Sequence, residues 1–498
     1  MVGKIVWLTV PLPWLMLCVL MVRGLTLPGS MKGLVFYLDP VWLELAKPTT
    51  WRFAFGQVFF SLSLAFGVMI TYASFLHRKS DINNNAAIIG LADFATSFIA
   101  GIAIFATLGG MAFASQQSGH NVAVEEVVKG GPGLAFVAFP YALAQLPGSA
   151  WWSFIFFFTL VTLGIDSAFS ITESVLAGII DKTGWKRCIV LPLMSLIGLA
   201  FGLFYVTRGG LNWLGAIDGF VNGTWGIAFL GLLECILLGW LYRVNILRNH
   251  ANERSDWSLG RWWNYAIRIF IPVILGTIFL WSLFDDFTNP EGFLKDADGR
   301  WIVTNCVGMT VVGIAPVIAI LMSLLKSPSR LVHGQQAQLH YPTQSMGKKS
   351  GVISFLMSLL SGIILIFLLK TGANGHEVFW MLLSLILGLA AVVISNYLLE
   401  KYDNTASEPS WFARWAGIIA TMDISAFLAI VLIYMIKDAP VTQTTSRVAD
   451  KLSGVSYVIL SVVFLLVVGG LGWCLFRAIT TATKDTPVEP QEISGAED

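Results

Sequence analysis

The sequence predicts an all-α polytopic membrane protein, and three features of the chain lead to this prediction. Hydrophobic residues make up 56 % and charged residues 12 % of the 498 residues, whereas a soluble domain has roughly 25 % charged residues. The mean hydropathy is +0.73. Apolar segments close to the roughly 20 residues that cross a bilayer recur along the whole chain. Together these features exclude a soluble globular domain.

Twelve candidate spans follow from the hydropathy pattern. The first is interpreted as a membrane helix rather than a signal peptide, because no A-x-A-like cleavage site follows it. The 19 Trp and 34 Phe are typical of rings that line the two membrane interfaces. The predicted spans are 4–23, 53–76, 84–112, 150–181, 187–206, 212–242, 262–285, 304–326, 352–371, 378–400, 411–436 and 454–477.

The loop charges predict the orientation. Basic residues gather in the loops at 77–79, 182–187, 243–254 and 326–349, while the loop at 286–303 is rich in acids. By the positive-inside rule, the basic loops are cytoplasmic. The N-terminus and the tail at 479–498 are then expected inside.

The polar segment 327–350 predicts the domain organisation. It is expected to be a cytoplasmic linker between a membrane domain of eight spans, 1–326, and a further block of four helices, 351–478. On the outside, the loop 113–149 is long, with a helical stretch from Val124 to Lys129. A lid over an extracellular vestibule and an ordinary surface loop are the two interpretations of it.

Acidic residues inside the spans are the first candidates for chemistry. Asp93, Asp166, Glu173 and Glu234 lie in predicted spans, and no basic residue is expected at matching depth. Charged groups in the membrane are costly and mark ion or substrate pathways. Carboxylates with hydroxyls and carbonyls are the hard oxygen ligands that suit a cation such as sodium. The five cysteines form no CxxC pair, so no zinc or redox motif is indicated.

Polar residues within the second span predict a helix that breaks. The core from Gln57 to Gly67 carries Ser61 and Ser63 among apolar residues. Broken helices expose carbonyls that hold ions and substrate near the midplane. The alternative is a continuous helix whose serines bond back to carbonyls one turn earlier.

Several runs in order resemble the neurotransmitter:sodium symporter family, from Gly3 to about Lys326. Gly3-Lys4-Ile5-Val6-Trp7 resembles the start of its fifth helix. GQVFFSLSLAFGVMITYASF (56–75), ATSFIAGIAIFATLGGMA (95–112) and TLGIDSAFSITESV (162–175) resemble its sixth, seventh and eighth helices. The resemblance implies a partial inverted-repeat symporter fold, comprising about helices 5–12 of the family, followed by the four extra helices.

The resemblance also implies roles for individual residues. Substrate would be bound by Phe60, as an aromatic gate, with Ser61, Ser63, Phe66, Ser167 and Ile171. One sodium ion would be held by Ser61 and Asp93, and a second by the Leu163 carbonyl with Asp166 and Ser167. Chloride would be bound by Gln57, Ser61 and Ser97. Asp93 departs from the asparagine usual in the family, which leaves chloride dependence open.

The resemblance does not extend to the family's first four helices. Their Asn-x-x-Arg-Phe-Pro-like signature has no counterpart here, and nothing in 352–477 resembles it. The chain is therefore expected to be a fragment, the product of a misplaced gene start, or one half of a split transporter whose partner supplies those helices.

Two functions follow as expectations. The first is sodium-coupled symport of an amino acid or related small solute across the cell membrane by alternating access, with the missing N-terminal helices supplied from elsewhere where transport needs them. The second is a transport-inactive homologue that acts as a membrane scaffold or regulatory subunit. An enzyme is not expected, since His376-Glu377 lacks the second His of a zinc protease motif and no Gly-x-Ser-x-Gly elbow is present.

Overall fold

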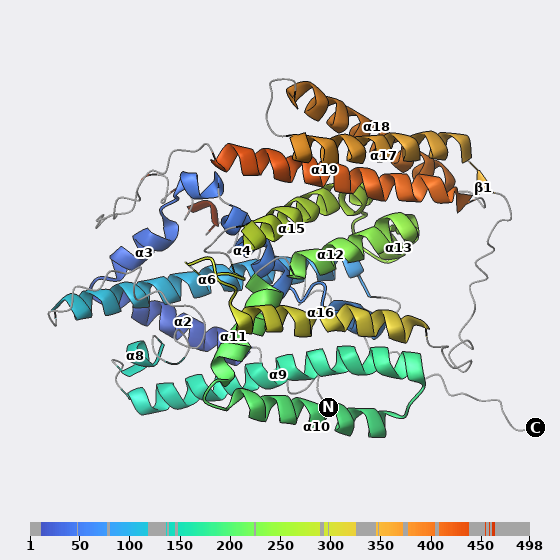
Figure 1. The fold of residues 1–498 in the computed structure, drawn as a ribbon. Coiled ribbons are helices and arrows are strands. Elements are labelled where there is room, and N and C mark those ends of the chain that lie inside the picture. The colour runs from blue at the N-terminus through green and yellow to red at the C-terminus, as the bar shows by residue number, and fades with distance from the viewer. Residues whose placement is uncertain are drawn as a thin grey trace, which may run out of the picture. The chain divides into compact units, whose positions relative to one another are not determined.

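The structure is a computed structural model of the 498-residue chain. It describes residues 11–46, 48–76, 80–117, 136, 139–144, 148–223, 226–288, 293–296, 298–324, 345–346, 348–371, 377–403, 408–437, 454, 458 and 461–463. Within these ranges the fold is almost wholly helical, and the regular strands are two residues long (Figure 1).

The membrane helices confirm the predicted all-α polytopic class. In the described ranges, nine helices are long and apolar enough to cross a membrane, or up to ten if one bent pair counts as a span. That pair is α2 (Pro11–Thr26) and α3 (Ser30–Leu38), which bend by 112°. The turn between them uses Gly29 with φ 85°, a conformation that glycine adopts without a Cβ clash.

The remaining predicted spans compare with the structure as follows. The span 53–76 is divided into α4 (Pro48–Ser61) and α5 (Val68–Ser74). The last span, 454–477, lies outside the described residues except at 454, 458 and 461–463, which are helical. The stretch Val124 to Lys129 also lies outside them, so the lid interpretation stays a prediction.

Two compact units make up the chain, and each is described by itself. The first comprises Met1–Val41, Asn84–Ser167 and Gln443–Asp498. Its described elements are α2, α3, most of α6 (Ile82–Gln117), α8 (Phe139–Ala144) and the first half of α9 (Ser149–Thr183).

Small residues allow the helices of the first unit to pack closely. A Cβ on Gly33 of α3 would overlap the Phe105 carbonyl of α6, and one on Gly109 would lie 2.6 Å from the Gly33 nitrogen. Close backbone approach of this kind drives helix association in lipid, where the hydrophobic effect between helices is absent. Met16, Leu20 and Leu143 form the apolar core beside these contacts.

The second unit comprises Trp42–Asn83 and Ala168–Thr442. Besides α4, α5 and the rest of α9, it contains the following elements: η1 (Trp42–Ala46), α10 (Arg187–Tyr205), α11 (Gly210–Gly223), α12 (Gly226–Ile236), η3 (Leu237–Leu241), α13 (Val244–Glu253), α14 (Trp262–Tyr265), η4 (Ala266–Phe270), α15 (Ile271–Thr288), α16 (Val303–Leu324), β1 (Ser345–Met346), α17 (Lys348–Thr371), α18 (Glu377–Asp403), β2 (Glu408–Pro409) and α19 (Trp411–Lys437).

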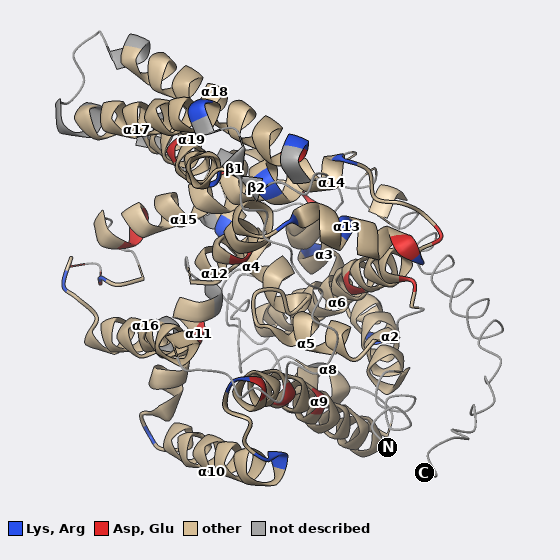
Figure 2. Ribbon diagram, turned by 90° about the vertical axis from the view of Figure 1, so that its right-hand side faces the viewer, with Lys and Arg blue, Asp and Glu red and all other residues tan. Residues whose placement is uncertain are grey.

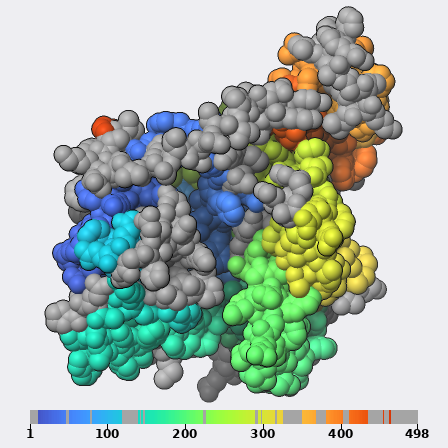
Figure 3. Space-filling view, turned by 60° about the vertical axis from the view of Figure 1, so that its left-hand side comes forward, coloured from blue at the N-terminus to red at the C-terminus, as the bar shows by residue number. Residues whose placement is uncertain are grey.

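The core of the second unit holds α4 in place. Leu232 of α12 and Leu275 of α15 form an apolar cluster against which Phe55 and Phe59 of α4 pack. Elsewhere α11 packs on α16, where a Cβ on Gly308 would meet Ala216. Figure 3 shows the green surface of α10 and α11 adjoining the yellow surface of α16.

Helices α17, α18 and α19 form a bundle that packs on α15 (Figure 1). Buried serines join its helices: Ser354 bonds Ser395 at 2.8 Å, and Ser361 bonds Ser384 at 3.1 Å. In α19, Asp423 accepts a hydrogen bond from Ser361. These helices share a compact unit with α10–α16, while the predicted domain boundary at 327–350 stays a prediction.

Candidate functional site

The predicted break in the second span is the centre of the candidate site. Helix α4 ends at Ser61 and α5 begins at Val68, so six residues, 62–67, leave the helix. Within them Ser63 has φ 53° and Ala65 has φ 63°, although neither is glycine. Such left-handed residues cost about 1–3 kcal/mol each and persist mainly at functional sites. The continuous-helix alternative is therefore wrong.

At the end of α4, the backbone hydrogen bonds depart from the regular i to i−4 spacing of an α-helix. The Leu62 amide still donates to the Val58 carbonyl at 3.1 Å, in helical spacing. The Ser63 amide then reaches back three residues to Phe60, and the Leu64 amide five residues to Phe59 at 2.8 Å. Amides at these changed spacings satisfy the last carbonyls of α4, which have no partner in the regular pattern of an α-helix.

Two side-chain bonds hold the break against α9. The Ser174 hydroxyl donates to the Phe66 carbonyl at 3.3 Å, inside the break. The Tyr72 hydroxyl and the Ser170 hydroxyl lie 2.6 Å apart, just beyond the break. Ser170 and Ser174 are one helical turn apart, so a single face of α9 receives the unwound segment and α5. Sequence reasoning missed this pair, although two serines at i, i+4 in an apolar helix were a visible signal.

The predicted substrate residues of the second unit gather at this junction. The Phe60 and Phe66 rings meet edge to face, with centroids 6.4 Å apart. Ile171 lies between the two anchoring serines on α9, and its side chain is 57 % exposed. Ser61 and Ser63 are half-buried at the break itself. The arrangement offers hydroxyls, backbone polar groups and two aromatic rings to a small polar solute.

The predicted sodium ligands of α9 lie in the first unit. Leu163, Asp166 and Ser167 occupy one continuous helix at spacings i, i+3 and i+4, which puts them on one face. The helical bond from the Ser167 amide uses one lone pair of the Leu163 carbonyl, and the second lone pair remains for a ligand. This donor set of carbonyl, carboxylate and hydroxyl fits a sodium ion by its chemistry.

Other predicted ion ligands are divided between the two units. Asp93 and Ser97 lie one turn apart on α6 in the first unit, whereas Gln57 and Ser61 belong to α4 in the second. The predicted sodium site of Ser61 with Asp93, and the chloride site of Gln57, Ser61 and Ser97, therefore stay predictions.

One expectation about charge was wrong. Glu173 was expected to lack a basic neighbour, but Arg187 binds both of its carboxylate oxygens at 2.7 Å. The reason is the turn after α9: Arg187 opens α10 directly beyond it, and its side chain reaches back along α9 to Glu173. Arg268, which the sequence analysis did not single out, is a basic residue wholly buried within a span. Figure 2 shows acidic residues along α9 and blue residues at the ends of α10.

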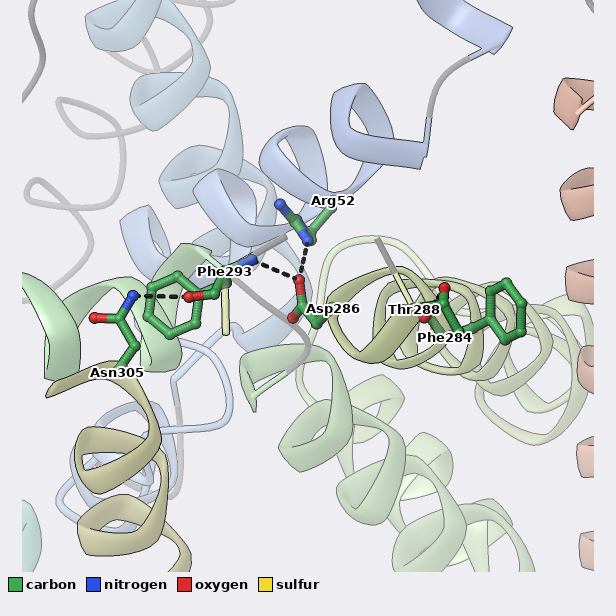
Figure 4. A network of polar contacts seen from close by, with 6 residues as sticks. All are labelled: Arg52, Phe284, Asp286, Thr288, Phe293 and Asn305. Carbon is green, nitrogen blue, oxygen red and sulfur yellow. Dashed lines mark hydrogen bonds and ion pairs between the residues drawn. The ribbon is translucent and has the colours of Figure 1, made fainter. Parts of the chain in front are cut away.

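A polar network fixes the start of α4 (Figure 4). Arg52 donates to Asp286, at the end of α15, over 3.3 Å, and the Phe293 amide donates to the same oxygen at 3.4 Å. Asn305 of α16 then donates to the Phe293 carbonyl at 2.7 Å. The Asp286 side chain is 2 % exposed. One carboxylate therefore ties the first half of the broken helix to α15 and α16.

A second network anchors the segment after α5. The Asn83 side chain is 3 % exposed and donates to the Trp257 carbonyl at 2.7 Å and to Asn252 of α13 at 3.2 Å. Nearby, Asp81 accepts from the Asp256 amide at 3.1 Å. The first half of the broken helix is thus fixed at its start, and the chain beyond its second half is fixed at the start of α6.

Comparison with known proteins identifies the family. The model of the sodium:neurotransmitter symporter family matches residues 1–330. The chain belongs to this family. The membership agrees with the sequence resemblance and with the expectation that the chain is not an enzyme. The match ends before α17, so α17, α18 and α19 lie beyond the family's part of the chain.

Curated relatives are about a third identical to the chain over the residues that align. An uncharacterized sodium-dependent transporter of Methanocaldococcus jannaschii is 35 % identical over 320 residues, covering 64 % of this chain and 62 % of that protein. The human sodium- and chloride-dependent neutral and basic amino acid transporter B(0+) is 37 % identical over 290 residues, covering 56 % and 44 %. The sodium- and chloride-dependent taurine transporter of Canis lupus familiaris is 34 % identical over 287 residues, covering 56 % and 46 %. The chain thus spans 44–62 % of the length of these relatives.

Proposed function

We propose that this chain carries out sodium-coupled symport of an amino acid or a related small solute by alternating access. The observation that carries the proposal is the break at 62–67, where two non-glycine residues keep left-handed conformations. Strain of this kind inside a membrane helix is retained where unwound backbone serves a ligand. The names of the relatives, which include sodium-dependent, amino acid and taurine transporters, support the same class of solute.

The proposed binding residues follow from this function. Asp166 supplies the charge of one sodium site, with the Leu163 carbonyl and the Ser167 hydroxyl as its neighbours on α9. Ser61 and Asp93 serve a second sodium ion. The solute binds at Phe60, Ser61, Ser63, Phe66, Ser167 and Ile171, with the Phe60 ring closing over it. Two relatives are named as chloride-dependent, and chloride binding at Gln57, Ser61 and Ser97 is the corresponding finer proposal.

The membrane arrangement belongs to the same proposal. The basic loops face the cytoplasm by the positive-inside rule, and with them the C-terminal tail 479–498. The protein then works in the cell membrane, where an inward sodium gradient exists to drive uptake.

The test is uptake of radiolabelled amino acids and taurine by cells that express this chain. We expect uptake in sodium medium and none in choline medium, and replacing chloride by gluconate measures the chloride requirement. Asp166→Ala should abolish the sodium-dependent part. The matched control is Asp181→Ala, which removes an exposed carboxylate from the same helix and should leave uptake unchanged.

Absence of sodium-dependent uptake in cells whose membranes contain the chain would contradict the proposal. That outcome would favour the second expected function, a homologue that does not transport and acts as a membrane scaffold or regulatory subunit.

A further inference from the structure

Two π-helical segments face each other in the second unit and bond to each other's backbone. They are η3 (Leu237–Leu241), at the end of α12, and η4 (Ala266–Phe270), at the start of α15. The Trp240 indole donates to the Arg268 carbonyl at 2.9 Å, and the Arg268 Nε donates to the Gly239 carbonyl at 2.9 Å. A π-helix is rare and appears mostly as single turns at functional sites, so two in contact require a local cause.

The helices beyond the family's part of the chain complete this pair of segments. Arg268 Nη1 donates to Asn396 of α18 at 3.4 Å. Arg414 of α19 donates to the Leu241 carbonyl at 2.7 Å. The Trp240 ring lies against Gly417 of α19, where any added Cβ would overlap the ring.

Burial makes these contacts mutually dependent. The Trp240 and Arg268 side chains are each 0 % exposed. A guanidinium inside a membrane protein needs hydrogen-bond acceptors, because leaving it unpaired there is very costly. Asn396 of α18 is one of its acceptors, so the family's part of the chain does not bury this arginine alone.

A second line of contact runs along α15. Ser425 of α19 donates to the Val273 carbonyl at 3.2 Å, and Thr277 donates to the Ser425 carbonyl at 3.4 Å. A Cβ on Gly276 would lie 2.6 Å from the Ser425 hydroxyl. The two helices are therefore packed at backbone distance, like the small-residue interfaces of stable membrane helix pairs.

We propose that α17, α18 and α19 form a built-in clamp. The clamp docks on η3, η4 and α15 and holds the two π-helical segments against each other. The clamp acts on the chain itself: its surface is Asn396, Arg414, Gly417 and Ser425, and its partner surface is Trp240, Arg268, Val273 and Gly276. It gives the helices after residue 350 a function that does not depend on which solute is transported.

The first test removes the docking contact on the clamp side only. In Gly417→Val the new side chain collides with Trp240 and should lift α19 from η3. Hydrogen exchange of the purified full chain, followed by mass spectrometry, should then rise about ten-fold or more at 237–241 and 266–270. The matched control is Gly198→Val in α10, where a Cβ would meet nothing within 4 Å, and its exchange should stay at the wild-type level. Unchanged exchange at η3 and η4 in Gly417→Val would overturn the proposal.

The second test fixes the contact between α15 and α19 by a covalent bond, and it remains decisive if Gly417→Val folds poorly. A Cβ on Gly276 would lie 2.9 Å from that of Ser425, so cysteines at both positions can form a disulfide after a small outward shift. With Gly276→Cys and Ser425→Cys on an otherwise wild-type chain, oxidation should yield the linked 276–425 peptide in mass spectrometry. Once this disulfide has formed in the chain without Gly417→Val, exchange at η3 and η4 should be no faster than in the wild type. A missing linked peptide, or a linked chain whose π-helical segments still exchange freely, would overturn the clamp.

These readouts are independent of transport. If uptake fails while the exchange and cross-linking results hold, the symport proposal falls and the clamp stands. If uptake is present while exchange is unchanged, the clamp falls alone.

Discussion

Loss of the Asp286 charge should destabilise the protein more than any ordinary surface substitution. Asp286 joins Arg52 at the start of α4 to the Phe293 amide beyond α15, and its side chain is 2 % exposed. Arg52 itself is 11 % exposed. In Asp286→Asn the shape and one acceptor oxygen remain, while the partner charge of a largely buried arginine is lost.

The magnitude follows from the burial of both partners. Removing one member of a buried ion pair costs about 3–5 kcal/mol, because the other charge stays buried and uncompensated. One kcal/mol shifts the melting temperature by roughly 2–4 °C in a domain of 150–250 residues. The second unit is larger, so the lower end applies, and the melting temperature should fall by roughly 6–10 °C.

The assay is a double-mutant cycle on melting temperature in detergent. Arg52→Met alone should also destabilise, since it leaves Asp286 without its cation. The double variant should regain most of the loss, because neither charge is then left alone. Asp298→Asn is the control: its side chain is exposed, so the change should stay within about 0.5 kcal/mol. Additive losses in the double variant, or a wild-type melting temperature for Asp286→Asn, would refute the buried pair.

Two further predictions concern the break and α9. Gly67→Ala places a Cβ at φ 72° and 3.1 Å from the Ser174 hydroxyl, which should cost about 1–2 kcal/mol, whereas Gly178→Ala on α9, with open space around it, should be neutral. Equal melting temperatures for Gly67→Ala and Gly178→Ala would contradict this prediction, because the break would then accommodate the added Cβ. Glu173→Gln should change stability little and leave sodium binding intact, because Arg187 is 59 % exposed and the pair is partly solvated. A loss of sodium binding as large as that of Asp166→Ala would contradict this interpretation.

Hydropathy predicted most of the helix positions because the bilayer imposes a length and an apolar composition on every span. The break in the second span was also predictable, since Ser61 and Ser63 interrupt an apolar run. The direction of the bend at Gly29 and the helix α3 beyond it were missed, because a single glycine after a proline gives no direction. The predicted span 150–181 nearly matches α9, but no local signal showed that the turn after it brings Arg187 of α10 back beside α9, which is why the Glu173–Arg187 pair was overlooked.

Contacts between distant segments had no sequence signal. Arg52 and Asp286 are 234 residues apart, and each alone looks like an ordinary residue at a helix end. The π-helical segments LLGWL and AIRIF read as plain membrane helix, and only Arg268 in the second is unusual. Its partner Asn396 on α18 depends on how a bundle docks, which periodicity does not specify. The candidate site was predictable as a set of residue types, and its anchoring by Ser170 and Ser174 was not.

The most direct test of the central claim is binding of radioactive sodium to the purified protein. We expect saturable binding that unlabelled sodium displaces and choline does not. Asp166→Ala should reduce this binding strongly, and Asp181→Ala should leave it unchanged. Wild-type binding in Asp166→Ala, or no saturable binding to a protein that is folded by its melting curve, would contradict the claim that α9 carries a sodium site.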